Sequence, residues 1–276
     1  MSRTFCIAEA GSTHDGDYEK AVRLIQVAKD AGADACKFQF WSSANRLAAR
    51  RQAQSYEEVY RRYQVPVVWL SWLAKACQVA GIEFMSTVYL PEDIPVVAPF
   101  VQRFKVASFE AGDVEFIAAH RQYRRPVIVS TGMMETLDAM PMINALGGQR
   151  PDQEPLHALL HCTSSYPCPL EQANLRAMED LRLLMPMLWN IGYSDHTAST
   201  LTGGIAVAAG AQILEVHFRL ADTDPANPDY ATALTPAELT EYVRLVRLAE
   251  VMLGSGVKEP QPVEAEMMPF RVRGRE

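Results

Sequence analysis

The chain has 276 residues, 49% of them hydrophobic, and a formal net charge of -7 at pH 7. This length can bury a large core, and it permits one large α/β domain or two small ones. The acidic balance argues against a nucleic-acid-binding protein, because such binding needs a basic surface that neutralises phosphates. The apolar runs are too short to cross a membrane. We therefore expect a soluble protein without a membrane or nucleic-acid partner and without a targeting segment.

The five cysteines lie mostly inside apolar runs, at Cys6, Cys36, Cys77, Cys162 and Cys168. An odd number of cysteines in such surroundings is typical of reduced, buried thiols, whereas disulfide frameworks are typical of secreted proteins. We expect a cytoplasmic protein with neither a disulfide framework nor a zinc knuckle.

Apolar runs alternate with helical patterns along most of the chain. Strands are predicted at 5–10, 35–40, 83–86, 103–107, 126–129, 156–161, 190–193 and 213–216. Helices are predicted at 18–31, 69–80, 114–123, 136–146, 175–185, 201–211 and 236–252. This regular alternation over roughly 250 residues predicts a single-domain (β/α)8 TIM barrel. The alternative, an open doubly wound sheet, usually has a glycine-rich phosphate fingerprint after its first strand, and GSTHDG at 11–16 lacks that spacing.

The segment 42–68 is polar, and it is too long for an ordinary connection. We predict a long loop with a helical piece that acts as a lid, or as part of a dimer interface, over the barrel mouth. One of its arginines would then meet the acceptor or its charged substituent, whereas the alternative is a solvated face used for solubility. The segment contains Arg46, Arg50, Arg51, Arg61 and Arg62, interleaved with Tyr56, Tyr60 and Tyr63.

Two histidines follow neighbouring predicted strands, His196 after 190–193 and His217 after 213–216. If both strands are parallel, the two imidazoles project from the same edge of the sheet. With Asp195 alongside, they can hold a divalent metal whose other positions stay open. The alternative is that each histidine only makes a hydrogen bond in a polar pocket.

Other polar residues also gather where predicted strands end, which is the face at which barrel enzymes keep their chemistry. Lys37 and Lys105 lie inside apolar runs, where an ammonium group is costly to bury without an anion. Two lysines and several hydroxyls predict a site for a phosphate and a carboxylate. Any single Ser or Thr there has the alternative of a local turn hydrogen bond. The full set is Glu9, Lys37, Thr87, Lys105, Ser108, Ser130, Thr131, Ser164, Tyr166, Ser194, Asp195, His196 and His217.

Seven sequence blocks resemble, in order, those of the sialic acid synthase (N-acetylneuraminate synthase) family. They are IAEAG at 7–11, GADACKFQ at 32–39, FKVASFE at 104–110, STGM at 130–133, LHCTSSYP at 160–167, GYSDHT at 192–197 and EVHF at 215–218. The resemblance extends from residue 7 to about residue 262 and covers most of the chain.

This resemblance implies a metal-dependent transferase that condenses phosphoenolpyruvate with the open-chain aldehyde of a sugar, giving a 2-keto-3-deoxy sugar acid and phosphate. It also implies a role for each matching position. His196 and His217 would hold Mn²⁺ or Mg²⁺, and Glu9 would handle protons or the attacking water. The phosphoenolpyruvate contacts would be Lys37, Thr87, Lys105, Ser108, Ser130, Ser164 and Ser194, to which we add Thr131. The residues facing the acceptor sugar would be Tyr166 and Asp229, to which we add Asp195.

The chain departs from the family pattern at three places. Family members usually continue into a small antifreeze-like domain whose arginine reaches the sugar of the other subunit. We therefore predict a barrel at 1–262, a tail at 263–276 and a homodimer. EVHF at 215–218 and DYAT at 229–232 each lack a lysine that the family has. Both changes remove positive charge near the acceptor, which would be N-acylmannosamine-like or a different aldose.

Two other functions fit parts of the pattern. One is a non-catalytic barrel that binds a phosphorylated ligand or a partner protein, and the other is a metal-dependent hydrolase. Hydrolase sites usually recruit more His and Asp ligands than the strand ends supply. The presence of Glu9, Lys37, Lys105, His196 and His217 together favours the synthase.

Overall fold

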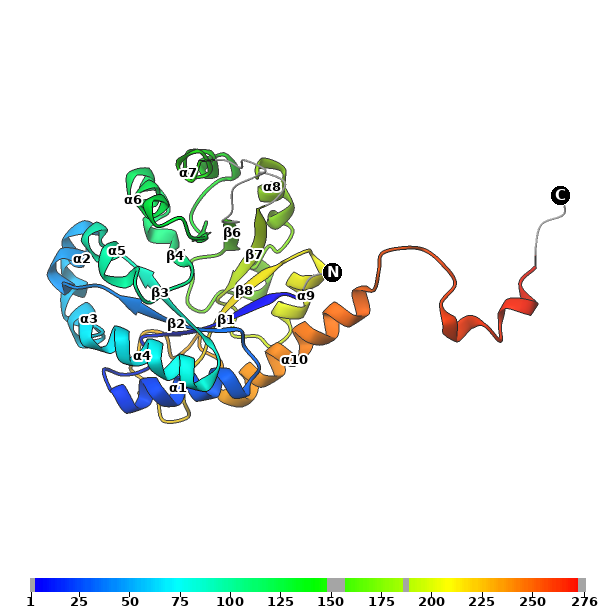
Figure 1. Cartoon of the computed structure of the whole chain (residues 1–276), viewed down its shortest axis with the longest axis horizontal. Helices are drawn as coiled ribbons and strands as arrows, with labels where there is room; N and C mark the ends of the chain where they lie inside the picture. Colours follow the sequence, from blue (N-terminus) through cyan, green and yellow to red (C-terminus); the bar gives the residue numbers. More distant parts are fainter. Residues whose placement is uncertain (1–2, 148–156, 186–188, 273–276) are drawn as a thin grey trace.

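Eight parallel strands form a closed barrel in the computed structural model (Figure 1), which describes residues 3–147, 157–185 and 189–272. The ladder between the first and last strands closes the sheet, with Phe5 opposite Ile213 and Glu9 opposite His217. This confirms the predicted (β/α)8 barrel, and the open-sheet alternative is wrong. The strands are β1 (Phe5–Gly11), β2 (Ala35–Phe40), β3 (Glu83–Val88), β4 (Phe104–Val106), β5 (Val127–Ser130), β6 (Ala158–Cys162), β7 (Asn190–Asp195) and β8 (Ile213–His217).

Helices surround the barrel and bury the outer face of its strands. Two predicted helices are interrupted: 114–123 divides into α6 and a 3₁₀ turn, and 136–146 divides into a 3₁₀ turn and α7. Residue 156, where the sixth strand was predicted to begin, lies outside the described residues. The helices are α1 (Tyr18–Asp30), α2 (Ala44–Arg50), α3 (Glu57–Arg62), α4 (Val67–Ala80), α5 (Ile94–Val97), α6 (Val114–Ala119), α7 (Ala139–Ala145), α8 (Ala177–Leu184), α9 (Thr202–Ala208) and α10 (Pro236–Leu253).

Side chains that point into the barrel change from apolar to polar along each strand. The part of the interior further from the carboxyl ends of the strands is apolar. A buried cluster there consists of Ile7, Ala35, Met85, Ile128, Ala158, Leu160 and Ile213. Successive side chains of a strand alternate between its faces, so the next inward residue lies two positions further along. At that position β1 has Glu9, β2 has Lys37 and β8 has Glu215. The barrel interior therefore has a layer of buried polar groups that lies closer to the carboxyl ends of the strands than the apolar cluster does.

The segment 42–68 is more regular than predicted, because it folds into α2, a 3₁₀ turn at Gln54–Tyr56 and α3. Ser43 caps α2 by accepting a hydrogen bond from the Arg46 N–H. Beneath the segment lies a small buried cluster that ties it to the loop after β3. The cluster consists of Trp41, Leu47, Tyr63, Tyr89 and Leu90.

The last helix, α10, begins with a capping box in which Thr235 and Glu238 satisfy each other's backbone N–H groups. It ends at Leu253, before the predicted domain boundary at 262. Residues 257–272 are all exposed and lead away from the barrel (Figure 1). The last part of the predicted tail, 273–276, lies outside the described residues. Within the described part of the chain, no helix is both long and apolar enough to cross a membrane.

Candidate active site

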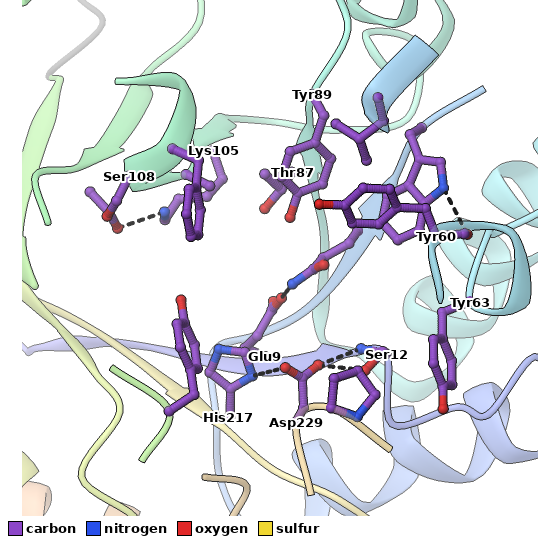
Figure 2. Close-up of a pocket in the computed structure, with 18 of the residues that line it drawn as sticks. Glu9, Ser12, Tyr60, Tyr63, Thr87, Tyr89, Lys105, Ser108, His217 and Asp229 are labelled. Atoms are coloured by element: carbon purple, nitrogen blue, oxygen red, sulfur yellow. Dashed lines mark hydrogen bonds and ion pairs between the residues drawn. The ribbon is translucent and has the colours of Figure 1, made fainter. Parts of the chain in front are cut away.

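A cavity of about 550 Å³ opens at the carboxyl ends of the strands. Most of the predicted site residues line it, and they come from all eight strands or from the loops that follow them. Figure 2 shows several of these side chains directed into the same space. The predicted residues that line the cavity are Glu9, Lys37, Thr87, Lys105, Ser108, Ser130, Tyr166, Ser194, His196, His217 and Asp229.

Three predicted residues do not line the cavity. Asp195 directly follows the inward-facing Ser194, so it points to the other side of β7, where it accepts hydrogen bonds from the backbone and hydroxyl of Thr197. The Thr131 hydroxyl donates to the carbonyl of Leu160. Ser164 packs against the backbone of Gly132, outside the cavity lining.

Lys37 lies at the centre of the buried polar layer. Its Nζ is 2.6 Å from Oε2 of Glu9 and donates to the Thr87 hydroxyl at 2.7 Å. The other oxygen of Glu9 accepts a hydrogen bond of 2.8 Å from the amide of Gln39. Gln39 was not predicted, yet it lies two residues after Lys37 on β2 and therefore on the same face of the strand.

Glu215, which was also not predicted, lies between the two buried lysines. Its carboxylate is 3.5 Å from Nζ of Lys37 and 3.5 Å from Nζ of Lys105, and it accepts a hydrogen bond of 2.9 Å from Ser194. Lys105 also donates to the Ser130 hydroxyl at 2.7 Å. The sequence signal was present, because Glu215 lies two residues before His217 on β8.

Burial and charge move the pKa values of this cluster in different directions. Burial raises the pKa of Glu9 to about 7, against the opposing effect of Lys37. Burial would also raise the pKa of Glu215, but Lys105 and Lys37 lower it to about 2. For Lys37, the two carboxylates outweigh burial and hold its pKa above the usual range, whereas burial lowers the pKa of Lys105. Lys105 is therefore the less well compensated cation, and an anionic ligand would stabilise it.

The two predicted imidazoles lie side by side, with ring centroids 5.4 Å apart. Nδ1 of His196 is 2.9 Å from the carbonyl oxygen of Thr163. A carbonyl only accepts, so this nitrogen carries a hydrogen, and Nε2 is the nitrogen that the neutral ring offers to a metal. Burial would lower the pKa of His196, but contacts with Cys162 and Thr163 outweigh burial and raise this pKa. Burial lowers the pKa of His217 to about 4, so this ring is neutral at pH 7. Its Nδ1 is buried, makes no hydrogen bond within the described residues, and lies 3.8 Å from Asp229.

These donors fit a divalent metal only with help from other ligands. Imidazole nitrogens are common metal ligands in proteins, whereas Mn²⁺ and Mg²⁺ take most of their ligands from oxygen. Among the described residues, however, no group of three or more His, Cys, Asp or Glu side chains is arranged to hold a metal ion. A metal held by His196 and His217 would therefore need oxygen ligands from substrate or water.

One side of the cavity is aromatic and belongs to loops and to the segment 42–68. Figure 2 shows Lys105 and Ser108 on one side of the pocket and Tyr60 and Tyr63 on the other. Sequence reasoning missed Trp41, Tyr89 and Phe109, which lie just beyond the ends of β2, β3 and β4. The aromatic residues of this half are Trp41, Tyr56, Tyr60, Tyr63, Tyr89 and Phe109.

Arg51, at the end of α2, is the arginine of this segment that lines the cavity. Its Nη2 is 2.7 Å from Oε1 of Glu110. The guanidinium carbon lies 4.8 Å from the ring centroids of both Tyr89 and Phe109. The predicted arginine at the mouth is therefore present, but it is held in an ion pair and lies against aromatic rings.

Comparison with known proteins identifies the family of this chain. The sequence model of the NeuB family matches residues 24–258. The chain belongs to the NeuB family. It is 34% identical to the N,N'-diacetyllegionaminic acid synthase of Legionella pneumophila, over 94% of this chain and 76% of that protein. It is also 34% identical to the human N-acetylneuraminate-9-phosphate synthase, over 94% of this chain and 74% of that protein.

A solved structure shares the architecture. The N-acetylneuraminic acid (sialic acid) synthetase of Leptospira borgpetersenii, crystallised with citrate, superposes with a TM-score of 0.86 at 29% identity, covering 98% of this chain and 92% of that one. The resemblance stated from the sequence blocks is thus confirmed at the level of the family.

Proposed function

We propose that this NeuB-family chain condenses phosphoenolpyruvate with the aldehyde of a sugar, giving a 2-keto-3-deoxy sugar acid and phosphate. One observation carries the proposal: Lys37 and Lys105 converge on Glu215 beside the imidazoles of His196 and His217. The lysines supply charge for an anionic donor, and the imidazoles are placed for activation of an electrophile. Relatives named as synthases of nine-carbon sugar acids support the same reaction class.

The lysine side of the cavity suits both anionic groups of phosphoenolpyruvate. Ammonium groups and hydroxyl donors together bind a phosphate and a carboxylate through charge-assisted hydrogen bonds. The Ser108 hydroxyl already accepts from the Gly132 N–H at 3.0 Å, so its own hydrogen is free to donate to a ligand. A Cβ at Gly132 would lie only 2.2 Å from the Ser164 hydroxyl oxygen, so this close approach requires glycine.

In the proposed reaction, C3 of phosphoenolpyruvate forms a bond to the aldehyde carbon, and the aldehyde oxygen takes up a proton. Positive charge then develops at C2, where water adds and loses a proton. The bond between C2 and the phosphate oxygen breaks, and phosphate leaves as the keto group forms. Glu9 is assigned the proton of the attacking water, because its pKa of about 7 suits a general base near neutral pH. Gln39 and Lys37 fix its two oxygens.

The acceptor half of the proposal rests on residues around the two histidines. His196 and His217 would hold Mn²⁺ or Mg²⁺, and the bound ion would supply a Lewis acid that polarises the aldehyde carbonyl. The Tyr166 ring lies 4.1 Å from the His196 ring and 5.8 Å from that of His217, between centroids. Asp229 is fixed by the backbone and hydroxyl of Ser12 (Figure 2). We assign Tyr166 and Asp229 to contacts with the sugar.

We also infer a cytoplasmic, homodimeric enzyme. Five free, buried cysteines support a reducing compartment. The dimer is supported by apolar side chains left exposed at the end of α10 and beyond, where Val251 and Met252 are each 77% exposed and Phe270 is 78% exposed. Sedimentation velocity of the whole chain tests the dimer directly.

The test of function is phosphate release from phosphoenolpyruvate with Mn²⁺, across a panel of aldehyde sugars. We expect sugar-dependent release that is lost in Lys105→Met and kept in Lys75→Met. Lys75 is a matched control because it lies on α4, donates to Gln78 and does not line the cavity. Binding of phosphoenolpyruvate without release for any sugar would contradict the proposal and favour a non-catalytic ligand-binding barrel.

A further inference from the structure

Every arginine of the segment 42–68 faces an acidic side chain. This arrangement differs from the expectation that one of them extends a free charge toward the substrate. The pairs are Arg46 with Glu92 at 2.8 Å, Arg50 with Asp113 at 2.6 Å, Arg51 with Glu110 at 2.7 Å, Arg62 with Asp224 at 2.7 Å, and Arg61 with Glu57.

Arg51 matters most, because it lines the cavity. Both its Nε and its Nη2 lie within hydrogen-bond distance of one oxygen of Glu110, at 2.9 and 2.7 Å. Glu110 is only 2% exposed, so its carboxylate cannot turn away to water. The guanidinium also lies over the rings of Tyr89 and Phe109. The positive charge of Arg51 is therefore neutralised within the wall of the cavity.

Within the part of the chain that the structure describes, the cavity has no further lysine or arginine for an anionic group on the acceptor sugar. Among the described residues, the lysines and arginines that line the cavity are Lys37, Arg51 and Lys105. The carboxylates that line it are Glu9, Glu215 and Asp229. The proposed function uses both lysines for phosphoenolpyruvate. The side of the cavity away from the lysines consists mainly of aromatic and apolar side chains, together with the paired Arg51.

We propose that the acceptor is an unphosphorylated sugar, whose end remote from the aldehyde packs against the aromatic half of the cavity. This rests on the proposed function and deepens it. Family membership does not decide the point, because the relatives include synthases named for a 9-phosphate product and for a product without phosphate. Phosphoenolpyruvate adds three carbons, so a phosphate at C9 of a product comes from C6 of the acceptor. A 6-phosphate would meet aromatic rings and Arg51, whose charge the buried carboxylate of Glu110 already neutralises, whereas the apolar face of a neutral sugar packs well on rings.

The test compares N-acetylmannosamine with N-acetylmannosamine 6-phosphate, measuring kcat/KM by phosphate release from phosphoenolpyruvate. We expect the neutral sugar to be preferred at least tenfold by the native enzyme. Glu110→Gln leaves the Arg51 charge unpaired at the cavity, and it should shift the ratio toward the 6-phosphate by about tenfold. Asp113→Asn is the matched control, because it frees Arg50, which does not line the cavity, while asparagine keeps the cap of α6. Its ratio should stay at the native value.

Arg51→Met provides a second variant if Glu110→Gln does not fold. It should leave the preference for the neutral sugar intact, because the native arginine does not serve a phosphate. Equal or better use of the 6-phosphate by the native enzyme, or loss of 6-phosphate use in Arg51→Met, would overturn the inference while leaving the proposed function in place. Phosphate release with neither sugar, nor with any other aldehyde sugar, would contradict the proposed function, and the inference would fall with it.

Discussion

The two halves of the cavity come from different parts of the chain and have different chemistry. The strand-end half, which carries Lys37, Lys105, Glu9 and Glu215, is charged and almost completely buried. The aromatic half comes from the segment 42–68 and from loops after β3 and β4, and its members range from the buried Tyr89 to Tyr56, which is 57% exposed. The first half is held by the barrel ladder, and the second is held by packing and ion pairs between loops.

This difference separates two tasks. Groups that must act on reacting atoms need fixed positions, and barrel strands fix side chains in register with their neighbours. In the ladder, Lys37 stands opposite Glu9, and Thr87 stands opposite Lys105. Contacts to the part of a substrate far from the reacting atoms depend more on the shape of the cavity than on its charge, and loops can supply that shape. Changes in the strand-end half should therefore abolish chemistry, and changes in the aromatic half should alter only the use of the acceptor.

The largest effect is expected at the two imidazoles. His196→Ala or His217→Ala should lower kcat by at least about 10³-fold, because each removes one of the two protein ligands of the proposed metal. Circular dichroism should show an unchanged fold, and metal content after dialysis should fall. Chelation by EDTA should inactivate the native protein, and added Mn²⁺ should restore it. Metal-free protein that turns over at the full rate would show that the Lewis-acid role is wrong.

The lysines should come next, and they should differ from each other. Lys37→Met and Lys105→Met should each weaken phosphoenolpyruvate binding by about 2–4 kcal/mol, since a charge-assisted contact in a shielded site is lost. Lys37→Met leaves Glu9 and Glu215 less compensated, so it should also destabilise the fold by about 3–5 kcal/mol. Lys105→Met removes a cation whose pKa burial lowers, and Lys37 still compensates Glu215, so the loss of stability should be smaller than in Lys37→Met.

Calorimetric titration with phosphoenolpyruvate and urea unfolding measure the two quantities separately. Unchanged affinity in both variants would remove these lysines from the site. Equal loss of stability in both would show that Lys105 is as well compensated as Lys37.

Much of the strand-end half was accessible from the sequence, because a barrel strand presents every second residue to its interior. Lys37 and His217 were found as polar residues at strand ends, and the same rule extended by two positions identifies Gln39 and Glu215. The rule also explains the error at Asp195, which follows the inward-facing Ser194 and therefore points outward. Strand periodicity, applied strictly, would have corrected all three positions.

The aromatic half was not accessible in the same way. Its central contact joins Arg51 to Glu110, 59 residues apart, and neither residue stands in a periodic pattern that points to the other. Tyr89 and Phe109 lie in loops after short strands, where side-chain direction depends on tertiary packing. The arginines were visible as a charged segment, but their acidic partners are scattered from Glu57 to Asp224. Only the folded structure shows that these charges are paired.

The dependence on pH should report Glu9. Its pKa of about 7 lies above the usual value, and the proposed base must be a carboxylate. We therefore expect kcat/KM to rise with pH and level off above about 7, falling about tenfold per unit below it. His217, with a pKa near 4, does not titrate in this range. Glu9→Gln should remove this rise of kcat/KM with pH, and it should lower kcat/KM at every pH.

The pH dependence of the unfolding free energy should also report the protonation of Glu9. Because the pKa of Glu9 is raised on folding, the protonated form is favoured in the folded state. Its stabilising contribution is complete below about 4.5 and is lost as pH rises through about 7. Glu9→Gln should flatten the unfolding free energy across this window. A native profile of kcat/KM that stays flat from pH 5 to 8 would contradict the role of Glu9 as base.

The smallest effect is expected in the aromatic half, where the Arg51 guanidinium lies over the Phe109 ring. Phe109 is 56% exposed, so its truncation leaves the barrel core intact and removes only part of the wall. Phe109→Ala should raise KM for the acceptor by about 2- to 10-fold, corresponding to about 0.5–1.5 kcal/mol of lost aromatic contact. The affinity for phosphoenolpyruvate should not change, because the lysines that bind it lie across the cavity. Arg61→Ala is the control, since Arg61 pairs with Glu57 within α3 and does not line the cavity. A loss of phosphoenolpyruvate affinity in Phe109→Ala as large as the loss for the acceptor would show that the two halves do not divide the substrates between them.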